Sequence, residues 1–286
     1  MTNLVWIDGE WLTSDQASIS VFDHGLLYGD GVYEGIRAYS GHIFKYQEHF
    51  NRLVRSARGI GLTLPISNAQ MKTVIVAGMA KAGLENAYIR IVVTRGSGPI
   101  GPDPGLCTSP KTIVILKDIP PLHGDDTPSI STAISTIRRV GIDSNPAEIK
   151  SLNYLPSVMG KAEANRIGVD DVILLDPFGF VSEAPVANLF IQEQGRILTP
   201  GVANGILSGI TRGFVIELLG ELGYEVDVGN ITPTQVLNAE EAFLTGTHAE
   251  LVSIGYHNGM KITGDFPGDT FMTLQEKFNA AKTQSL

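Results

Sequence analysis

Cysteine is almost absent from this chain, since Cys107 is the single one among 286 residues. One cysteine excludes an internal disulfide and any metal site built from several thiolates, and it is typical of a reducing compartment. Long apolar runs are also missing: no window approaches the roughly 20 residues of a membrane-spanning helix. Residues 1–6 contain no basic stretch leading into an apolar one, as a secretory leader would. We therefore expect a cytoplasmic protein that does not enter a membrane.

Basic residues are the minority charge. The chain has 21 Lys and Arg against 30 Asp and Glu, a net charge of -9. Such a chain lacks the electrostatic driving force for nucleic acid or an anionic membrane, so we expect neither as a partner. The content of 43% hydrophobic and 18% charged residues is that of an ordinary globular protein. The 32 glycines and 15 prolines are typical of a fold with many turns and a sheet.

Local signals divide the first half of the chain into hairpins, helices and strands. Hairpins are predicted around Asp8-Gly9 and around Ser40-Gly41, because apolar runs flank each turn. Apolar spacing predicts helices over 46–60 and 68–82, the second with Asn68 as its N-cap. Strands are predicted over 87–94 and 112–116.

The second half mixes strands and helices without regular βαβ alternation. The pattern predicts strands over 129–140, 171–175 and 187–192, helices over 156–167 and 210–222, and a capping box at Thr232–Gln235. Proline, glycine and charge interrupt the pattern at 117–127. We therefore predict an α+β protein of two domains: 1–119, a linker at 120–127, and 128–286 carrying Lys150.

Several common chemistries find no support. Gly96–Gly101 reads G-x-G-x-x-G, but Pro102 and Pro104 follow it and oppose the helix that a dinucleotide site needs. The six histidines include no i, i+4 pair, and Ser208 stands outside G-x-S-x-G spacing. The sequence thus predicts neither NAD binding nor a zinc or serine hydrolase, and no metal.

Three segments of the second half contain residues that favour a different chemistry. Lys150 stands among apolar neighbours with Tyr154 four residues on, as a Schiff-base lysine requires. Glu183 comes just before an apolar strand, where a carboxylate can pair with a pyridine nitrogen and keep the ring an electron sink. The small-residue loop at 207–212 opens a helix, and free N–H groups there form a phosphate site.

Together these segments resemble the fold-type IV (class IV) pyridoxal-phosphate-dependent aminotransferases. The signature runs through Glu183, Asn188-Leu189-Phe190, Leu198-Thr199-Pro200 and Gly209-Ile210-Thr211-Arg212, and the resemblance covers Trp6 to about Val252. It implies a D-amino-acid aminotransferase-like fold, pyridoxal 5'-phosphate as cofactor, and a homodimer or higher homo-oligomer. Lys150 would hold the cofactor covalently. The other implied cofactor-binding residues are Arg52, Tyr154, Glu183, Leu207, Gly209, Ile210, Thr211 and Thr247.

Within that family, the first half is most like a branched-chain amino acid aminotransferase. Tyr88-Ile89-Arg90 is similar to the Tyr-x-Arg of these enzymes, whose pocket takes aliphatic chains and also the distal carboxylate of glutamate. The residues that the resemblance assigns to substrate are Tyr28, Tyr33, Arg37, Tyr88, Arg90, Thr247 and His248. The expected reaction is transamination of leucine, isoleucine and valine with 2-oxoglutarate.

Alternatives remain at this point. A D-amino-acid or (R)-amine transaminase, an aminodeoxychorismate lyase, and a non-catalytic binding protein on the same scaffold are all compatible with parts of the pattern. Two residues depart from the family: Pro185 stands where Ser or Thr is usual, and His248 stands where branched-chain enzymes usually have Ala. His248 leaves the range of amino donors open.

Overall fold

The computed structural model describes residues 4–124, 128–144 and 146–283, and it divides the chain into two compact units. Among the described residues, unit 1 comprises 4–119, Ile149–Asn153 and Thr283, and unit 2 comprises Pro120–Glu148 and Tyr154–Lys282. Lys150 therefore groups with unit 1, although the sequence predicted it in the second domain. Residues 125–127 of the predicted linker lie outside the described residues.

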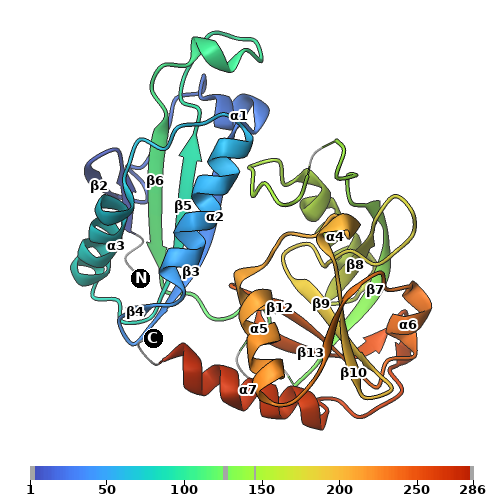
Figure 1. Ribbon diagram of the computed structural model, residues 1–286. Helices are drawn as coiled ribbons and strands as arrows, with labels where there is room; N and C mark the ends of the chain where they lie inside the picture. Colours follow the sequence, from blue (N-terminus) through green and yellow to red (C-terminus); the bar gives the residue numbers. More distant parts are fainter. Residues whose placement is uncertain (1–3, 125–127, 145, 284–286) are drawn as a thin grey trace. The chain divides into compact units, whose positions relative to one another are not determined.

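Unit 1 is one antiparallel sheet with two long helices (Figure 1). Its described elements are β1 (Leu4–Ile7), β2 (Glu10–Thr13), α1 (His24–Tyr28), β3 (Gly31–Tyr39), β4 (His42–Ile43), α2 (Tyr46–Gly59), α3 (Asn68–Ala82), β5 (Ala87–Thr94) and β6 (Lys111–Lys117). The strand order is β2-β1-β6-β5-β3-β4. Both predicted hairpins are confirmed, as β1–β2 and β3–β4.

Helices α2 and α3 cover one face of this sheet. Leu53 of α2 and Ile75 of α3 belong to one apolar cluster with Ile36 of β3 and Ile89 of β5, and all four are fully buried. Because successive side chains of a strand point to opposite faces, the neighbours of these strand residues face away from the helices. The second face of the sheet thus receives Tyr33.

Helix α3 has the predicted bounds, but its N-cap differs from the predicted one by one residue. The N-cap is Ser67 rather than Asn68, because the Ser67 hydroxyl accepts from the Gln70 amide and the Gln70 side chain accepts from the Ser67 amide. This reciprocal capping box satisfies two N–H groups, which the Asn68 side chain does not do. Gly83 ends the helix at φ 64°, in the left-handed region.

Unit 2 contains a mixed sheet of strands in the order β11-β10-β9-β12-β13-β7-β8, with β14 paired to β13 (Figure 1). Its described elements are β7 (Ile130–Arg138), α4 (Leu155–Ile167), β8 (Asp171–Leu175), β9 (Asn188–Glu193), β10 (Arg196–Pro200), α5 (Ile210–Glu221), β11 (Val226–Gly229), α6 (Pro233–Leu237), β12 (Glu241–Gly246), β13 (Glu250–His257), β14 (Met260–Lys261) and α7 (Asp269–Lys282). Helix α4 packs on β7 and β8, and α5 packs on β12 and α7.

The mixture of helices with mainly antiparallel strands agrees with the predicted α+β class. The parallel pairs are β7–β8, β7–β13 and β10–β11. Strand β8 has the predicted bounds, and the Thr232 capping box before α6 is confirmed. Strand β12 and helix α7 were not predicted from the sequence.

The G-x-G-x-x-G segment forms a loop, as its prolines predict. Residues 96–101 contain no helix and are followed by a short 3-10 turn at Pro104–Leu106. His24 fixes the loop, since its amide donates to the Gly96 carbonyl and its Nε2 lies 3.0 Å from the Pro99 carbonyl oxygen. The loop therefore lacks the helix N-terminus that a dinucleotide would need.

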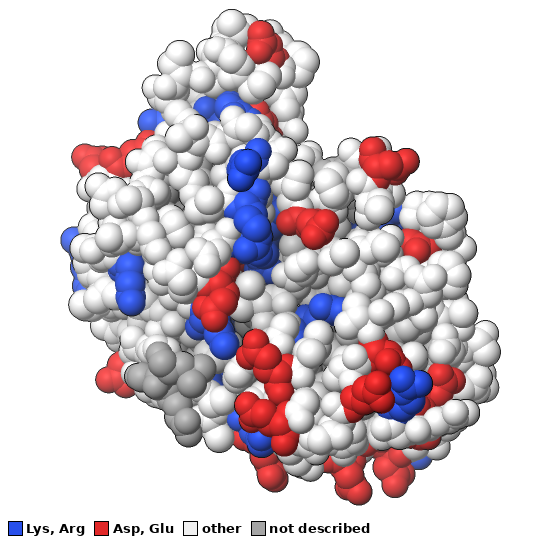
Figure 2. Space-filling model, viewed as in Figure 1, with Lys and Arg blue, Asp and Glu red and all other residues white. Residues whose placement is uncertain are grey.

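The face shown in Figure 2 carries mixed charge. On the face shown in Figure 2, Lys and Arg stand in small groups among neutral side chains, with Asp and Glu near many of them. No helix of the described chain is long and apolar enough to cross a membrane.

Candidate active site

Lys150 is held against strand β3 by backbone hydrogen bonds. The Tyr33 amide donates to the Lys150 carbonyl and the Leu152 amide donates to the Gly31 carbonyl, each over 3.0 Å. The Lys150 amide donates to Ser56 Oγ on α2, also over 3.0 Å. These bonds explain why a lysine far along the chain groups with unit 1, and they fix where its side chain starts.

The Lys150 amine lies over the ring of Tyr33. Lys150 Nζ is 4.5 Å from the centre of that ring, and the Arg90 guanidinium carbon lies at 4.5 Å from the same centre. Tyr33 is 5% exposed, so both contacts are largely shielded from water. The electron-rich face of an aromatic ring attracts such groups when they are charged. A lysine, an arginine and a tyrosine predicted from separate motifs thus meet on one face of unit 1.

Tyr88 joins this group from the same strand as Arg90. Arg90 Nη2 donates to the Tyr88 hydroxyl over 3.1 Å, and β5 pairs with β3 so that Arg90 lies opposite Gly35. A Cβ at Gly35 would come within 2.5 Å of the Tyr88 hydroxyl oxygen, so glycine makes room for the ring. Arg37 is opposite Tyr88 and donates from Nη1 to the Ile119 carbonyl over 3.1 Å.

Tyr28 is placed differently from the other predicted substrate residues. Its hydroxyl accepts from the Gly101 amide over 2.7 Å and its ring meets that of His24 edge to face. The side chain of Tyr28 is 37% exposed and contacts the loop of residues 96–101. These contacts join Tyr28 to the loop rather than to Tyr33 or Arg90, and its predicted role in substrate binding stays a prediction.

Arg52 is anchored on the helix-facing side of the sheet by Glu34. Arg52 donates to Glu34 from Nε over 2.6 Å and from Nη2 over 2.9 Å, and His49 Nδ1 donates to the same carboxylate over 2.8 Å. The carboxylate is an acceptor only, which assigns the Nδ1–H tautomer to His49. All three side chains are buried.

Burial and charge act in opposite directions in this cluster. Burial raises the pKa of Glu34, but Arg52 and His49 outweigh it and lower that pKa to about 2. Burial lowers the pKa of His49, Glu34 opposes this, and Arg52 and Lys150 lower it further. Neutral His49 therefore leaves Glu34 and Arg52 as the ion pair that fixes the guanidinium predicted to bind phosphate.

Glu183 is a buried carboxylate of unit 2 with donors on both of its oxygens. Arg139 Nη2 donates to Oε1 over 2.6 Å, while Asn188 Nδ2 and the Leu207 amide donate to Oε2 over 2.9 and 3.1 Å. Glu183 is 4% exposed. Asn188 Nδ2 also donates to the Leu207 carbonyl, which ties the strand to the loop before α5. Such a site presents a fixed anion, as a pyridine N–H requires.

The loop before α5 fits a phosphate group. Helix α5 starts after Gly209, whose extended backbone provides no side-chain cap for the first N–H groups. A Cβ at Gly209 would collide with Asn188 Oδ1, so the position admits only glycine without rearrangement. Thr211 is 5% exposed in the first turn. Ile210 is half-buried beside it.

The turn predicted to bind the substrate carboxylate connects β12 and β13. Thr247 and His248 occupy it, and the His248 carbonyl accepts from the Leu122 amide over 2.8 Å. Tyr154 is the N-cap of α4 in the same unit. The ring of Pro185 packs closely on Gly160 of α4. A Cβ added at Gly160 would lie 3.3 Å from Cγ of Pro185.

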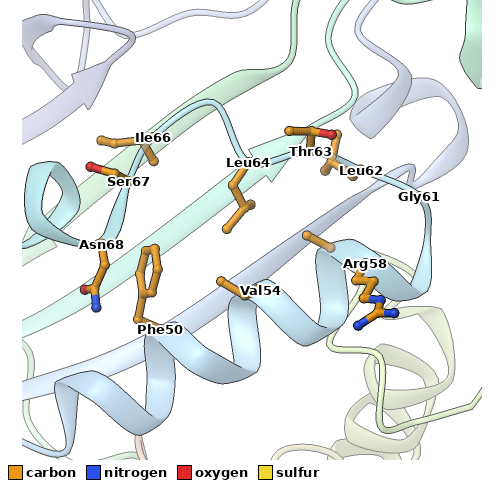
Figure 3. A pocket seen from close by; sticks show the side chains of 11 residues that line it. Phe50, Val54, Arg58, Gly61, Leu62, Thr63, Leu64, Ile66, Ser67 and Asn68 are labelled. Atoms are coloured by element: carbon orange, nitrogen blue, oxygen red, sulfur yellow. The ribbon is translucent and has the colours of Figure 1, made fainter.

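A groove of about 470 Å³ lies elsewhere on unit 1 (Figure 3). Phe50, Val54 and Arg58 of α2 line one side, and residues 61–64 and 66–68 line the other. None of the predicted site residues contributes to it. Among the described residues, no group of three or more His, Cys, Asp and Glu side chains could hold a metal ion.

Four residues that contact the predicted site residues were not themselves predicted as part of the site. Glu34 and His49 hold Arg52, and Arg139 and Asn188 hold Glu183. Glu34 carried a signal, since a charged residue at that place in an apolar strand points into the helix-covered face. Arg139 carried none, because it stands next to Arg138 in a strand end that reads as solvated.

Comparison with known proteins agrees with this geometry. The model of the Amino-transferase class IV family matches residues 31–255. A putative branched-chain-amino-acid aminotransferase of Methanocaldococcus jannaschii is 43% identical over 98% of this chain and 96% of its own length.

Solved structures give the same result. The branched-chain amino acid aminotransferase of Escherichia coli superposes with a TM-score of 0.95 at 30% identity, covering 99% of this chain and 95% of that one. The branched-chain amino acid aminotransferase of Thermoproteus uzoniensis, solved with norvaline, superposes with a TM-score of 0.92 at 31% identity, with the same two coverages. The predicted resemblance and fold type are confirmed: the chain belongs to the class IV aminotransferases.

Proposed function

We propose that this protein catalyses pyridoxal-phosphate-dependent transamination of leucine, isoleucine and valine with 2-oxoglutarate, which gives branched-chain 2-oxo acids and L-glutamate. The solved relatives named above are branched-chain amino acid aminotransferases, and the relative from Methanocaldococcus jannaschii is named as a putative one. The observation that carries the proposal is the group formed by Lys150, Tyr33, Tyr88 and Arg90 on one face of unit 1. Aromatic rings suit an aliphatic side chain, and a guanidinium suits the distal carboxylate of glutamate.

The residues of the chain fit the cofactor. Glu183 offers an oriented carboxylate for the ring nitrogen, and the N-terminus of α5 after Gly209 offers N–H groups to the phosphate. Arg52 adds a guanidinium fixed by Glu34. The remaining cofactor residues of this proposal are Tyr154, Leu207, Ile210, Thr211 and Thr247. When bound, pyridoxal phosphate supplies an electron sink for the carbanion that forms at the substrate α-carbon.

Each protein group then has a stated task. The Lys150 amine would hold the cofactor covalently and would serve as the general base that takes the substrate α-proton. Glu183 holds the proton on the ring nitrogen. Arg90 binds the distal carboxylate of glutamate or 2-oxoglutarate, whereas Tyr33 and Tyr88 contact the aliphatic side chains. The turn of Thr247 and His248 receives the α-carboxylate on its N–H groups, and Arg37 and Tyr28 border the pocket.

The visible absorption spectrum of the purified protein tests this function. We expect a band from the lysine-bound cofactor that L-leucine bleaches and D-alanine leaves unchanged. Lys150→Ala should lose both the covalent cofactor and turnover. Bleaching by D-alanine alone would overturn the substrate assignment, and no band after incubation with pyridoxal phosphate would overturn the cofactor assignment.

We further propose a homodimer located in the cytoplasm. Exposed apolar side chains gather on α1 and the segment before it: Val21 is 67% exposed, Phe22 51% and Leu26 61%. The Gly98 amide donates to the Phe22 carbonyl, which joins this segment to the loop where Ile100 is 80% exposed. Contiguous apolar surface of this kind marks a protein interface.

Sedimentation of the wild type and of Leu26→Ser tests this assembly. A dimer that dissociates in the variant is expected. A monomeric wild type, or a dimer that the substitution leaves intact at the lowest concentration, would contradict it. The low cysteine content supports the cytoplasmic location.

A further inference from the structure

Glu183 contacts a residue that is distant in sequence, Arg139. Arg139 follows directly after β7, and its amide donates to the Leu175 carbonyl at the end of β8 over 2.9 Å. Residue 183 lies beside the same strand, because the Leu174 amide donates to the Glu183 carbonyl over 3.0 Å. The parallel pairing of β7 with β8 therefore brings Arg139 and Glu183 together.

The side chain of Arg139 is itself fixed at both ends of its guanidinium. Nη2 donates to Glu183 Oε1 over 2.6 Å, and Nη1 donates to the buried Ser157 hydroxyl of α4 over 3.4 Å. The two charged side chains are 14% and 5% exposed. A charge-assisted bond in such a poorly solvated place is stronger than a neutral one and orients both partners.

The other donors described for Glu183 are neutral. Asn188 Nδ2 and the Leu207 amide occupy Oε2. Arg212 is a second cation in the same unit, but its Nε and Nη2 donate to Thr199 Oγ1 and the Pro200 carbonyl. Its charge reaches Glu183 only at a distance: burial lowers the pKa of Arg212 and Glu183 opposes that shift. Among the contacts described for the Glu183 carboxylate, Arg139 is thus the one that comes from a cation.

We infer that Arg139 is a positioning residue for cofactor binding: it keeps Glu183 ionised and oriented toward the ring nitrogen. A cation in contact favours the charged form of a carboxyl group, whereas a buried carboxyl without one tends to take up a proton. A protonated Glu183 cannot accept the pyridine N–H as an anion does. Without Arg139, affinity for the cofactor becomes weaker as the pH falls. This inference rests on the proposed function.

The test compares cofactor binding by the full-length apoprotein at two pH values. Equilibrium dialysis against pyridoxal phosphate gives the dissociation constant of each variant at pH 8.5 and pH 6.0, divided by that of the wild type. Arg139→Gln removes the charge, Arg139→Lys retains it, and Arg138→Gln is the matched control. Arg138 is the exposed neighbour, whose Nη1 donates to the Ser135 carbonyl.

We expect the ratio for Arg139→Gln to rise about tenfold between pH 8.5 and pH 6.0, because one carboxyl then takes up a proton that the wild type excludes. Arg139→Lys and Arg138→Gln should keep a ratio independent of pH. Arg139→Met, which preserves the apolar stem, carries the same expectation and serves if the glutamine variant does not fold.

Two results overturn the inference. If the ratio of dissociation constants is the same at both pH values for Arg139→Gln and Arg139→Met, Arg139 acts only through packing. The same conclusion follows if their ratios match the ratio for Arg138→Gln. Failure of the wild type to bind pyridoxal phosphate is a separate outcome, which overturns the proposed function itself. Thermal unfolding of each apoprotein identifies variants whose weaker binding reflects lost folding.

Discussion

Lys150 Nζ lies 4.5 Å from the centre of the Tyr33 ring, although the two residues come from different halves of the chain. The same pair is joined in the backbone, where the Tyr33 amide donates to the Lys150 carbonyl. Strand β3 therefore fixes the backbone of Lys150 and also provides the ring that its amine contacts. A covalent cofactor lysine needs such a defined starting point, because it must return to one position after each turnover.

Replacing Tyr33 should affect catalysis through its ring rather than its hydroxyl. Tyr33→Leu removes the aromatic face that contacts Lys150 and Arg90, and a contact of about 0.5–1 kcal/mol corresponds to a roughly two- to fivefold lower kcat/KM for leucine. Tyr33→Phe retains the face and should stay within about twofold of the wild type. Steady-state kinetics measure both. Equal losses in the two variants would assign the effect to the hydroxyl instead.

Replacing Arg90 should separate the two substrate classes. Arg90→Gln removes the cation predicted to bind the distal carboxylate, so kcat/KM for 2-oxoglutarate should fall about 10- to 100-fold, as the loss of a charge-assisted hydrogen bond implies. The half-reaction with leucine, followed at the cofactor band, should change less than about threefold. An equal loss with leucine would mean that Arg90 acts through Tyr33 and Tyr88.

Glu34 should contribute stability that is lost in acid. Its pKa is about 2 in the folded protein against an ordinary value of 4.5. Because the folded pKa is lowered, the contribution is complete above pH 4.5 and disappears as the pH falls toward 2, with a change of about 3 kcal/mol. Urea unfolding of the apoprotein across this window measures the decline, and Glu34→Gln should remove that part of it.

The same substitution should already be costly at pH 7. Glu34→Gln leaves the buried Arg52 cation without its counter-charge, and such a change costs about 3 kcal/mol in the free energy of unfolding. Glu48→Gln is the control on α2, because the Glu48 side chain is 47% exposed and pairs with Lys45 at the surface over 3.6 Å. It should cost less than about 1 kcal/mol. Equal unfolding midpoints for the two variants would contradict the prediction.

His257 should produce a second, separate pH window. It is fully buried in β13 with Nδ1 at 2.9 Å from Thr132 Oγ1, and burial lowers its pKa from 6.5 to about 4. Between these values the unfolded chain binds the proton and the folded chain does not. Stability therefore falls by about 3 kcal/mol as the pH drops from 6.5 to 4, with no further loss from this group below that.

His257→Gln removes the titrating group and should flatten this part of the stability profile. Urea unfolding of wild type and variant at pH 7 and pH 4.5 measures the difference. A variant whose unfolding free energy declines as steeply as that of the wild type would show that another group causes the acid sensitivity.

Local features of the sequence were sufficient for most helices and strands. The predicted strand at 87–94 has the bounds of β5, and the predicted helix at 68–82 has those of α3. Apolar periodicity and caps act over a few residues, so they can be interpreted without tertiary contacts. The N-cap of α3 was misassigned by one residue, because Ser67 competes with Asn68 and the reciprocal bond to Gln70 decides between them. Helix α7 was missed.

By itself, the sequence determined the family, because Lys150, Glu183 and the segment 207–212 follow one another in the order and with the residue types of the class IV aminotransferases. The same segments supply predicted residues of the site. Only the tertiary structure decided which side chains meet. Pairing of β3 with β5 sets Tyr88 over Gly35, and packing of α2 buries Arg52 against Glu34. Pairing of β7 with β8 brings Arg139 to Glu183. Such contacts join residues far apart in the chain, and no local propensity encodes them.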